Sequence, residues 1–323
     1  MNKVLKAFAI PAFMSALSGC EHPQHAHPQH AHPQHAHPQH EHAESASDLA
    51  HHAPLTVATW NIEHLAFPSN TGCKPRSQQD IEKLRSYANS LDANIVALQE
   101  VASKEALKAV FPENNWQIIM SEREDSPIYD CRESNYKSTQ QKVAFAVHKS
   151  IDIVDITHNN QFNLDMPGLR NGLAITVNTT LGNTEILNVH LKSGCFVDDF
   201  SNSDKRACQV LEKQAPILDS WLEQRESANT PFIMLGDFNH RLATGQNKLF
   251  EVLSNNTNNQ SSTLHLSTKN MIGCHPRYPA PIDHIIIGGS KANYADKKAV
   301  IHNFENMKED EMLSDHCAVS ITL

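Results

Sequence analysis

The sequence predicts an α+β fold, a two-layered β-sandwich with helices on its outside. Short apolar and β-branched runs recur from residue 55 to the last residue, which is typical of strands. Longer segments between them place apolar side chains at helical spacing. About 270 residues follow the N-terminal region, enough for one large domain. The expected strands are LTVAT, NIVAL, VAFAVHK, LAITVNT, TEILNVH, FIMLGD, IDHIIIG and CAVSITL.

Three segments are expected to be helices. Residues 78–91 have the apolar spacing of an amphipathic surface helix. Residues 104–111 follow Ser103, a residue type that caps helix N-termini well. Residues 204–225 form the longest expected helix, and we expect its Trp221 and Leu222 to pack in the core.

Six short polar signatures stand against the ends of expected strands. The first four follow their strands, whereas the last two precede theirs. If the last two strands run antiparallel to the others, all six signatures meet at one edge. Acids, amides and histidines together are the composition of a hydrolytic metal site. The signatures are Trp60-Asn61-Ile62-Glu63, Gln99-Glu100, Asn188-Val189-His190, Gly236-Asp237-Phe238-Asn239, Asp283 and Ser314-Asp315-His316.

These motifs, read as WNIE, LQE, NVHLKS, GDFNHR, PIDHI and LSDH, resemble those of the endonuclease/exonuclease/phosphatase superfamily in number, order and approximate spacing. The resemblance spans residues 55–323, the catalytic domain that we place at 54–323. It implies the DNase I-like fold, a four-layered α/β/β/α sandwich of two mostly antiparallel sheets with flanking helices. It also implies a metal-dependent phosphoric ester hydrolase.

The resemblance assigns a metal site to three of these residues. Glu100 is the best ligand, because a carboxylate at a strand end suits Mg²⁺, which prefers oxygen. Asn61 and Asp315 resemble the supporting ligands of the family. Mn²⁺ or Ca²⁺ are alternatives for the same site.

The resemblance also assigns catalytic roles. His316 resembles the base that takes a proton from the attacking water, and Asp283 is expected to fix its tautomer. His190 is expected to bind the scissile phosphate. Asp237 and Asn239 are expected to orient the water or the phosphate, or to contact a second metal. Arg170 is a candidate phosphate contact, although a surface salt bridge explains it equally well.

The N-terminus predicts export. Residues 1–19 contain Lys3 and Lys6, then an apolar stretch, and end in LSG before Cys20. LSGC resembles a bacterial lipobox, so we expect Cys20 to carry a lipid that anchors the protein to a membrane. Glu21 at the next position favours the outer membrane, at its periplasmic face or at the cell surface. The alternative is ordinary signal cleavage next to an incidental cysteine.

Residues 20–53 are expected to be a tether. HPQH recurs with period five and ends in HPQHEHAE, and this stretch has nine histidines and almost no apolar bulk. Such a segment cannot bury enough surface to fold alone, and regular Pro stiffens it. Neutral imidazoles also suit Zn²⁺, Ni²⁺ or Cu²⁺, so metal capture is a second reading that is compatible with the first.

The net charge of the chain restricts how it could bind nucleic acid. Removing Lys3 and Lys6 from the 27 basic residues leaves 25 against 36 acidic ones, a net charge of −11. This argues against a broadly basic nucleic-acid groove but permits a nuclease with a local Arg cluster and a bound cation.

Six cysteines remain after Cys20, which suggests disulfides with fifteen possible connectivities. The best pairings are Cys195–Cys208, Cys73–Cys131 and Cys274–Cys317.

Three functions therefore stand. The first is an exported Mg²⁺-dependent nuclease, most readily a monomeric DNA endonuclease of modest sequence preference. The second is a phosphodiesterase or phosphatase that acts on phospholipid or small phosphate esters. The third is a binding module whose active segment is the His-rich repeat. Loop residues that could enter a DNA groove, or could only decorate disulfide-tied loops, are Arg76, Arg123, Arg132 and Tyr136.

Overall fold

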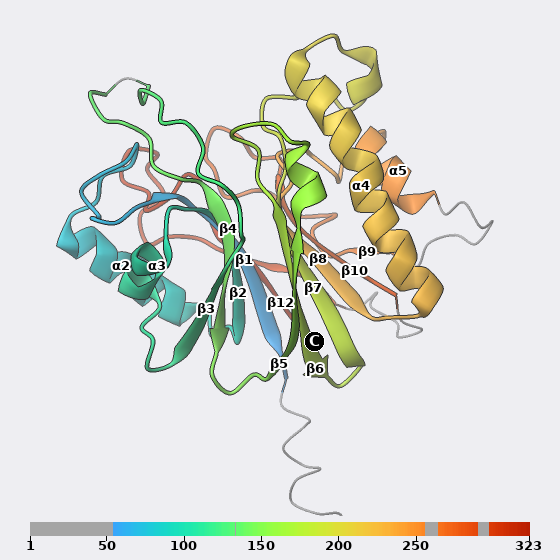
Figure 1. Cartoon of the computed structure of the whole chain (residues 1–323), viewed down its shortest axis with the longest axis horizontal. Helices are drawn as coiled ribbons and strands as arrows, with labels where there is room; N and C mark the ends of the chain where they lie inside the picture. The colour runs from blue at the N-terminus through green and yellow to red at the C-terminus, as the bar shows by residue number, and fades with distance from the viewer. Residues whose placement is uncertain (1–53, 133, 256–263, 290–296) are drawn as a thin grey trace, which may run out of the picture. The chain divides into compact units, whose positions relative to one another are not determined.

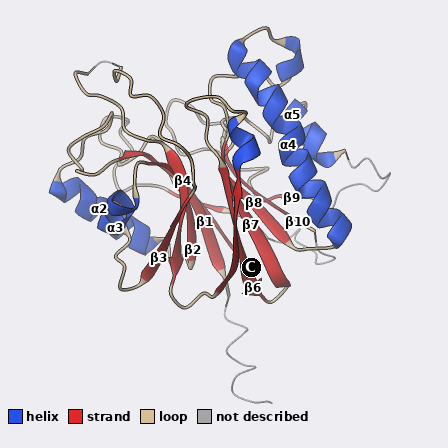
Figure 2. Cartoon of the chain, viewed as in Figure 1, coloured by secondary structure: helices blue, strands red, loops and turns tan. Residues whose placement is uncertain are grey.

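The computed structural model describes residues 54–132, 134–255, 264–289 and 297–323, in which two six-stranded sheets lie face to face between two layers of helices (Figure 1). The sheets and the helices outside them are distinguished by colour in Figure 2. This is the four-layered arrangement that the motifs led us to expect. The expected signal segment and the His-rich tether lie outside the described residues.

The first sheet has β1 and β2 as its central parallel pair, and all its other neighbours are antiparallel. Its order is β11 (Val300–His302), β12 (Ala318–Thr322), β1 (Thr56–Leu65), β2 (Ile95–Val101), β4 (Lys142–His148) and β3 (Trp116–Met120).

The second sheet repeats this plan, with β7 and β8 as its single parallel pair. Its order is β5 (Ile153–Asn159), β6 (Gly172–Thr179), β7 (Gly182–His190), β8 (Phe232–Asp237), β10 (Asp283–Gly288) and β9 (His265–Leu266). Both sheets are therefore mixed, with antiparallel neighbours in the majority.

Two helices cover each outer face. α2 (Gln78–Ser90) and α3 (Lys104–Val110) pack on the first sheet, and α4 (Arg206–Ala228) and α5 (Lys248–Ser254) pack on the second (Figure 1). Ser77 and Asp80 form a capping box at the start of α2, and Ser103 caps α3 as expected. Trp221 and Leu222 of α4 are buried in the core, also as expected.

A third apolar cluster fills the space between the sheets. Aliphatic side chains such as Val57, Ile95, Ile175 and Ile285 meet there and are almost fully buried. Burial of each such side chain stabilises the fold by about 1.5–3 kcal/mol. This layer holds the two sheets in a fixed relation, so residues at the edge of one sheet can form a site with residues of the other.

The structure differs from the sequence-based expectation at the strand ends. WNIE does not follow a strand, because β1 continues through it to Leu65. β1 and β2 both have register shifts there, and Glu63, His64 and Glu100 have positive φ angles of 48°, 51° and 61°. Such bulges redirect side chains near functional sites. The short strands β3, β5, β9 and β11 and helix α5 were also not expected.

The three disulfides are those that we considered best. Cys73 pairs with Cys131, Cys195 with Cys208 and Cys274 with Cys317, which confirms the expected connectivity. The bonded cysteines are 58, 13 and 43 positions apart in sequence. Within the part of the chain that the structure describes, no helix combines the length and the hydropathy needed to cross a membrane.

Candidate active site at the edge of the two sheets

Strand pairing brings the polar signatures together. Asp237 of β8 lies beside His190 of the parallel strand β7 and beside Asp283 of the antiparallel strand β10. β12 runs antiparallel to β1, so the segment before it returns to the same edge. There the Ser314 hydroxyl donates to the backbone carbonyl of Asn61 at 2.7 Å. The expected antiparallel direction of the last two strands is confirmed.

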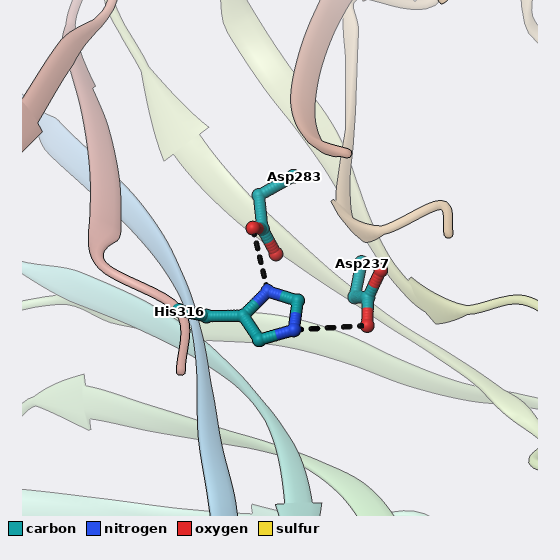
Figure 3. A group of neighbouring side chains, drawn as sticks. All are labelled: Asp237, Asp283 and His316. Carbon is teal, nitrogen blue, oxygen red and sulfur yellow. Dashed lines mark hydrogen bonds and ion pairs between the residues drawn. The ribbon is translucent and has the colours of Figure 1, made fainter. Parts of the chain in front are cut away.

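His316 and Asp283 form a hydrogen-bonded pair, and His316 lies between Asp283 and Asp237 (Figure 3). Its Nδ1 is 2.7 Å from Asp283 Oδ2, and its Nε2 is 4.0 Å from Asp237 Oδ2. Burial alone lowers the pKa of His316, but Asp283, Asp315 and Asp237 outweigh burial and raise that pKa well above its ordinary value. This pairing fixes the tautomer and leaves Nε2 as the ring atom available to a proton.

Asp237 is the buried centre of the group. Its Oδ2 accepts hydrogen bonds at 3.0 Å from the side-chain amides of both Asn61 and Asn239, and its Oδ1 accepts at 2.8 Å from the Asn239 backbone. Burial raises the pKa of Asp237 to about 7, despite the neighbouring imidazole of His316. The two asparagines hold this carboxyl group in place, and the hydrogen bond from Asn61 opposes the rise of its pKa.

His190 joins this centre to Glu100. Its Nε2 lies 3.4 Å from Asp237 Oδ2 and 3.9 Å from Glu100 Oε1. Burial, followed by Arg170, lowers the pKa of His190 well below its ordinary value, so the ring is neutral at neutral pH. Its Nδ1 is buried and has no hydrogen-bond partner among the described residues.

Glu100 lies among two histidines and an arginine. His64 approaches Oε2 with its ring at 3.6 Å and donates its backbone N–H at 3.2 Å, while Arg170 lies 4.0 Å from Oε1. Burial raises the pKa of Glu100, but His190, His64 and Arg170 outweigh burial and lower it to about 2. Arg170 is the permanent cation of the three. It also donates to Gln141 at 2.9 Å, so it belongs to the site and is not a remote surface ion pair.

Asp315 adds a further acid near Glu100. Its backbone N–H donates to the Glu63 carboxylate at 3.0 Å, and Lys74 pairs with the same Glu63 oxygen. Burial raises the pKa of Asp315, and the negative charges of Glu63 and Glu100 raise it further. Crowded carboxylates of this kind favour a divalent cation, and carboxylate and amide oxygens are the donors that Mg²⁺ prefers. Glu100, Asp315 and Asn61 offer oxygen donors of this type.

A second arrangement of potential ligands is present. Among the described residues, Asp237, Asp283 and His316 have ligand atoms within 4.8 Å of one another. Nδ1 of His316 is already engaged with Asp283 at 2.7 Å, however. A cation bound there would have to use Nε2 of His316, the ring atom that faces Asp237, so it would compete with proton uptake at that nitrogen.

Two amides of the motifs have a structural role. Gln99 of β2 donates to the side chain of Asn188 of β7 at 2.7 Å, and Asn188 donates to the backbone carbonyls of Leu98 and Ala144. All these groups are buried, so the bridge satisfies polar atoms between the sheets. It holds Glu100 and His190, the next motif residues, in a fixed relation across the two sheets.

Other residues near the motifs lie elsewhere or were missed. Arg76 is buried and donates to the backbone carbonyls of Ile62 and Leu313, so it cannot enter a DNA groove. His240 and His284 are buried in hydrogen bonds behind the site. His64 was missed, although it directly follows WNIE; its neighbour Gln141 comes from a loop 77 positions away in sequence.

Two recesses lie beside the cluster. A cavity of about 740 Å³ is lined by His316, Asp283, Asn239 and the loops near residues 195–198 and 273–282. A smaller cavity of about 250 Å³ is lined by Gln141, Tyr129 and Arg123. Gln141 contacts both Arg170 and His64, so this second recess lies next to the group around Glu100.

Comparison with known proteins agrees with this fold. The human Nocturnin catalytic domain with bound sulfate anion is 16% identical, with a TM-score of 0.58, covering 83% of this chain and 92% of that chain. D. rerio TDP2 complexed with single strand DNA product is 14% identical, with a TM-score of 0.57, covering 84% of this chain and 98% of that chain. The endonuclease/exonuclease/phosphatase from Bacteroides vulgatus is 16% identical, with a TM-score of 0.56, covering 84% of this chain and 98% of that chain. At these identities, the likeness shows the fold.

No curated protein matches the chain by sequence. A family model does match, over residues 58–316, and this range contains every residue of the cluster described above. Endonucleases, exonucleases and phosphatases share the hydrolysis of phosphoric esters. The chain belongs to the endonuclease/exonuclease/phosphatase family.

Proposed function

We propose that this protein is an exported, divalent-metal-dependent phosphodiesterase that cleaves DNA as an endonuclease. One observation carries the hydrolytic part of the proposal. The hydrogen-bonded pair His316–Asp283 faces the buried Asp237 at 4.0 Å, and Asp237 connects through His190 to Glu100. The cluster thus combines a base with an acid that orients it and an oxygen-rich cation site, which are the parts that phosphodiester hydrolysis needs.

The chain's own residues supply proton transfer and orientation. Nε2 of His316 accepts a proton from the attacking water, and Asp283 stabilises the imidazolium that forms. Asp237, held by Asn61 and Asn239, orients this water. His190 and Arg170 offer N–H groups to the phosphoryl oxygens, where negative charge develops.

The cation site is assigned to Glu100, Asp315 and Asn61. Mg²⁺ is the proposed ion because all three donors are hard oxygens, and Mn²⁺ or Ca²⁺ can replace it there. When bound, the cation supplies Lewis-acid stabilisation of charge on the phosphoryl and leaving oxygens. Arg170 neutralises part of the Glu100 charge, which would favour exchange of the ion over permanent retention.

Cleavage within a DNA strand is supported by the two recesses. One lies beside His316 and the other beside the group around Glu100, so a chain that places its scissile phosphate on the cluster has room on both sides. Arg132 and Arg241 line the first recess and Arg123 lines the second. These arginines place positive charge beside the cluster, where it can contact DNA phosphates, although the chain has a net charge of −9.

The test is nicking of supercoiled plasmid by the disulfide-intact protein, with Mg²⁺, with a chelator and with His316→Ala. Nicked circles are expected before linear fragments, and both the chelator and the substitution should abolish them. Absence of cleavage by folded protein would reject the nuclease. Release of nucleotides from linear DNA without nicking of circles would replace the endonuclease by an exonuclease.

Phospholipid or small phosphate esters are the second candidate substrates. Phe196 and Val197 at the mouth of the larger cavity are 70% and 38% exposed, and apolar side chains at a mouth suit a lipid chain. A panel of plasmid, sphingomyelin vesicles and bis(p-nitrophenyl) phosphate separates the candidates. Hydrolysis of the vesicles without plasmid nicking would establish this alternative.

Export and anchoring complete the proposal. Three disulfides in one unit suit an oxidising compartment. Cys20 is proposed to carry a lipid that holds the protein at the outer membrane, with residues 20–53 as the tether. Labelling of cells with a radioactive fatty acid should mark the wild type and leave Cys20→Ser unlabelled. Label on the variant, or none on either protein, would reject the anchor.

A further inference from the structure

The larger cavity combines exposed aromatic rings with exposed cations. Phe196 is 70% exposed and Tyr278 is 58% exposed, and both line the same cavity as His316. Arg132 and Arg241 line it too, and neither guanidinium forms an ion pair or hydrogen bond with any residue that the structure describes. Exposed apolar groups that line a recess can mark a ligand-binding groove.

The acids in this cavity are already engaged. Asp283 is bonded to His316, and Asp198 accepts a hydrogen bond from the Thr244 hydroxyl at 2.9 Å. The Asp315 carboxylate lies 3.8 Å from Nε2 of His316. The arginines are therefore the charged groups that remain for a ligand, and planar guanidinium groups recognise phosphate well.

The aromatic walls are held in place. Cys195 precedes Phe196 and is joined to Cys208 at the start of α4. Tyr278 packs on His275 with ring centroids 4.9 Å apart, and its backbone N–H donates to the carbonyl of His275.

The remaining walls are tied in the same way. Cys274 joins the loop of Tyr278 to Cys317, the residue after His316, while Cys131 fixes the residue before Arg132 by its bond to Cys73. Phe196, Tyr278 and Arg132 thus each lie within four residues of a disulfide-bonded cysteine. Such pre-organisation lowers the entropic cost of holding a ligand.

We infer that this cavity binds an unstacked nucleobase of a single-stranded nucleic acid, which stacks on Phe196 and Tyr278 while Arg132 and Arg241 contact the adjoining phosphates. Stacking tolerates any base because every base has a π-face, and arginines that track the backbone read no sequence. In a duplex the bases are paired and stacked on one another, so they are not free to enter. The inference rests on the proposed nuclease function and specifies its substrate as single-stranded DNA or locally opened duplex.

The test compares three labelled oligonucleotides with the disulfide-intact full chain and Mg²⁺: a single strand, a hairpin duplex of the same sequence, and the single strand with tetrahydrofuran residues in place of nucleosides. The kcat/KM of the wild type on the single strand should be at least about tenfold higher than its kcat/KM on the duplex. Phe196→Ala and Tyr278→Ala should each raise KM on the single strand about tenfold, with kcat within about twofold.

The base-free strand distinguishes stacking from damage to the fold. On it the two variants should match the wild type, because no base is present to stack. Ile156→Ala, which removes an exposed apolar side chain from the edge strand β5, is the control and should behave as wild type on all three substrates.

The failures of the two proposals are distinguishable. Equal cleavage of hairpin and single strand, or unchanged KM in both aromatic variants, would overturn the base pocket while the nuclease stands. Loss of activity on the base-free strand as well would also overturn it, because the rings would then be needed for the fold. If no oligonucleotide is cleaved but sphingomyelin vesicles are, and Phe196→Ala lowers that hydrolysis, the cavity binds lipid and both proposals fall.

Discussion

Glu100 and His316 stand at the two ends of one chain of ionisable contacts, and the charges around them are reversed. His64, His190 and Arg170 surround the carboxylate of Glu100 and lower its pKa to about 2. Asp283, Asp315 and Asp237 surround the imidazole of His316 and raise its pKa well above the ordinary value. The fold thus keeps one end ionised to hold a cation and makes the other end basic enough to take a proton.

This contrast also has a structural origin. Glu100 is turned toward the site by adjacent bulges in β1 and β2, whereas Asp237 and Asp283 come from a regular antiparallel pair. His190 and Asp237 connect the ends, with Nε2 of His190 at 3.9 Å from Glu100 and 3.4 Å from Asp237. Substitutions at either end should therefore have different signatures in metal dependence and in pH dependence.

The largest effect is expected at the Glu100 end. Glu100→Gln removes the charge that holds the cation, so kcat/KM should fall by about 10⁴-fold and the Mg²⁺ concentration for half activity should rise. Initial rates across a Mg²⁺ titration measure both. Glu113→Gln, which alters only an exposed ion pair with Lys108, is the control and should leave both unchanged. An unaltered Mg²⁺ requirement in Glu100→Gln would place the cation elsewhere, with the group of Asp237, Asp283 and His316 as the next candidate.

The base end should show a smaller loss. His316→Gln removes the proton acceptor but leaves the oxygen ligands in place, so kcat should fall by about 10³-fold with the Mg²⁺ dependence unchanged. His158→Gln, at a partly buried histidine of β5 that lies 3.7 Å from Glu122, is the matched control. A shift in the Mg²⁺ requirement of His316→Gln would show that the two ends are not separable.

Asp283→Asn should change the pH profile more than the rate. The imidazole is active as a base only when deprotonated, so kcat in the wild type should rise with pH through the raised pKa of His316. Loss of the Asp283 charge lowers that pKa, which moves the rise to lower pH and reduces the plateau by about tenfold. Rate profiles of both proteins measure the shift, with Asp155→Asn as a control on the exposed strand β5. A profile that does not move would remove Asp283 from its assigned role.

The smallest effect is expected in the free energy of unfolding of the protein, measured with a chelator present so that no cation is bound. The folded-state pKa of Glu100 is lowered, so its contribution is present above about pH 4.5 and is lost as the pH falls toward about 2. The folded-state pKa of His316 is raised, so its contribution is present below about pH 6.5 and is lost as the pH rises through the raised value. Urea unfolding across a pH series measures the free energy of unfolding of the wild type, Glu100→Gln and His316→Gln. The difference between wild type and Glu100→Gln should vanish at low pH, and the difference between wild type and His316→Gln should vanish at high pH. Differences that vanish at the same end would contradict the reversed charges.

The fold and most of the site could be predicted from local signals. The strand runs, the cap Ser103 and the order of the six motifs depend on residues close together in sequence, and the structure agrees with them. β5 was missed because its outward side chains are exposed at a sheet edge, and β9 because two residues carry no periodicity. The WNIE segment was placed after β1 instead of within it, because a bulge changes direction without changing composition.

The sequence alone determined which chemical groups this protein has and at which strand ends they stand, because strand periodicity and motif order are local properties. Only the tertiary structure decided which of those groups meet. His64 and Gln141 reach Glu100 and Arg170 through a bulge and a distant loop, and Gln99 with Asn188 became a buried bridge between sheets. The pKa of a side chain depends on burial and on charges within a few ångströms, and both arise only when two sheets pack.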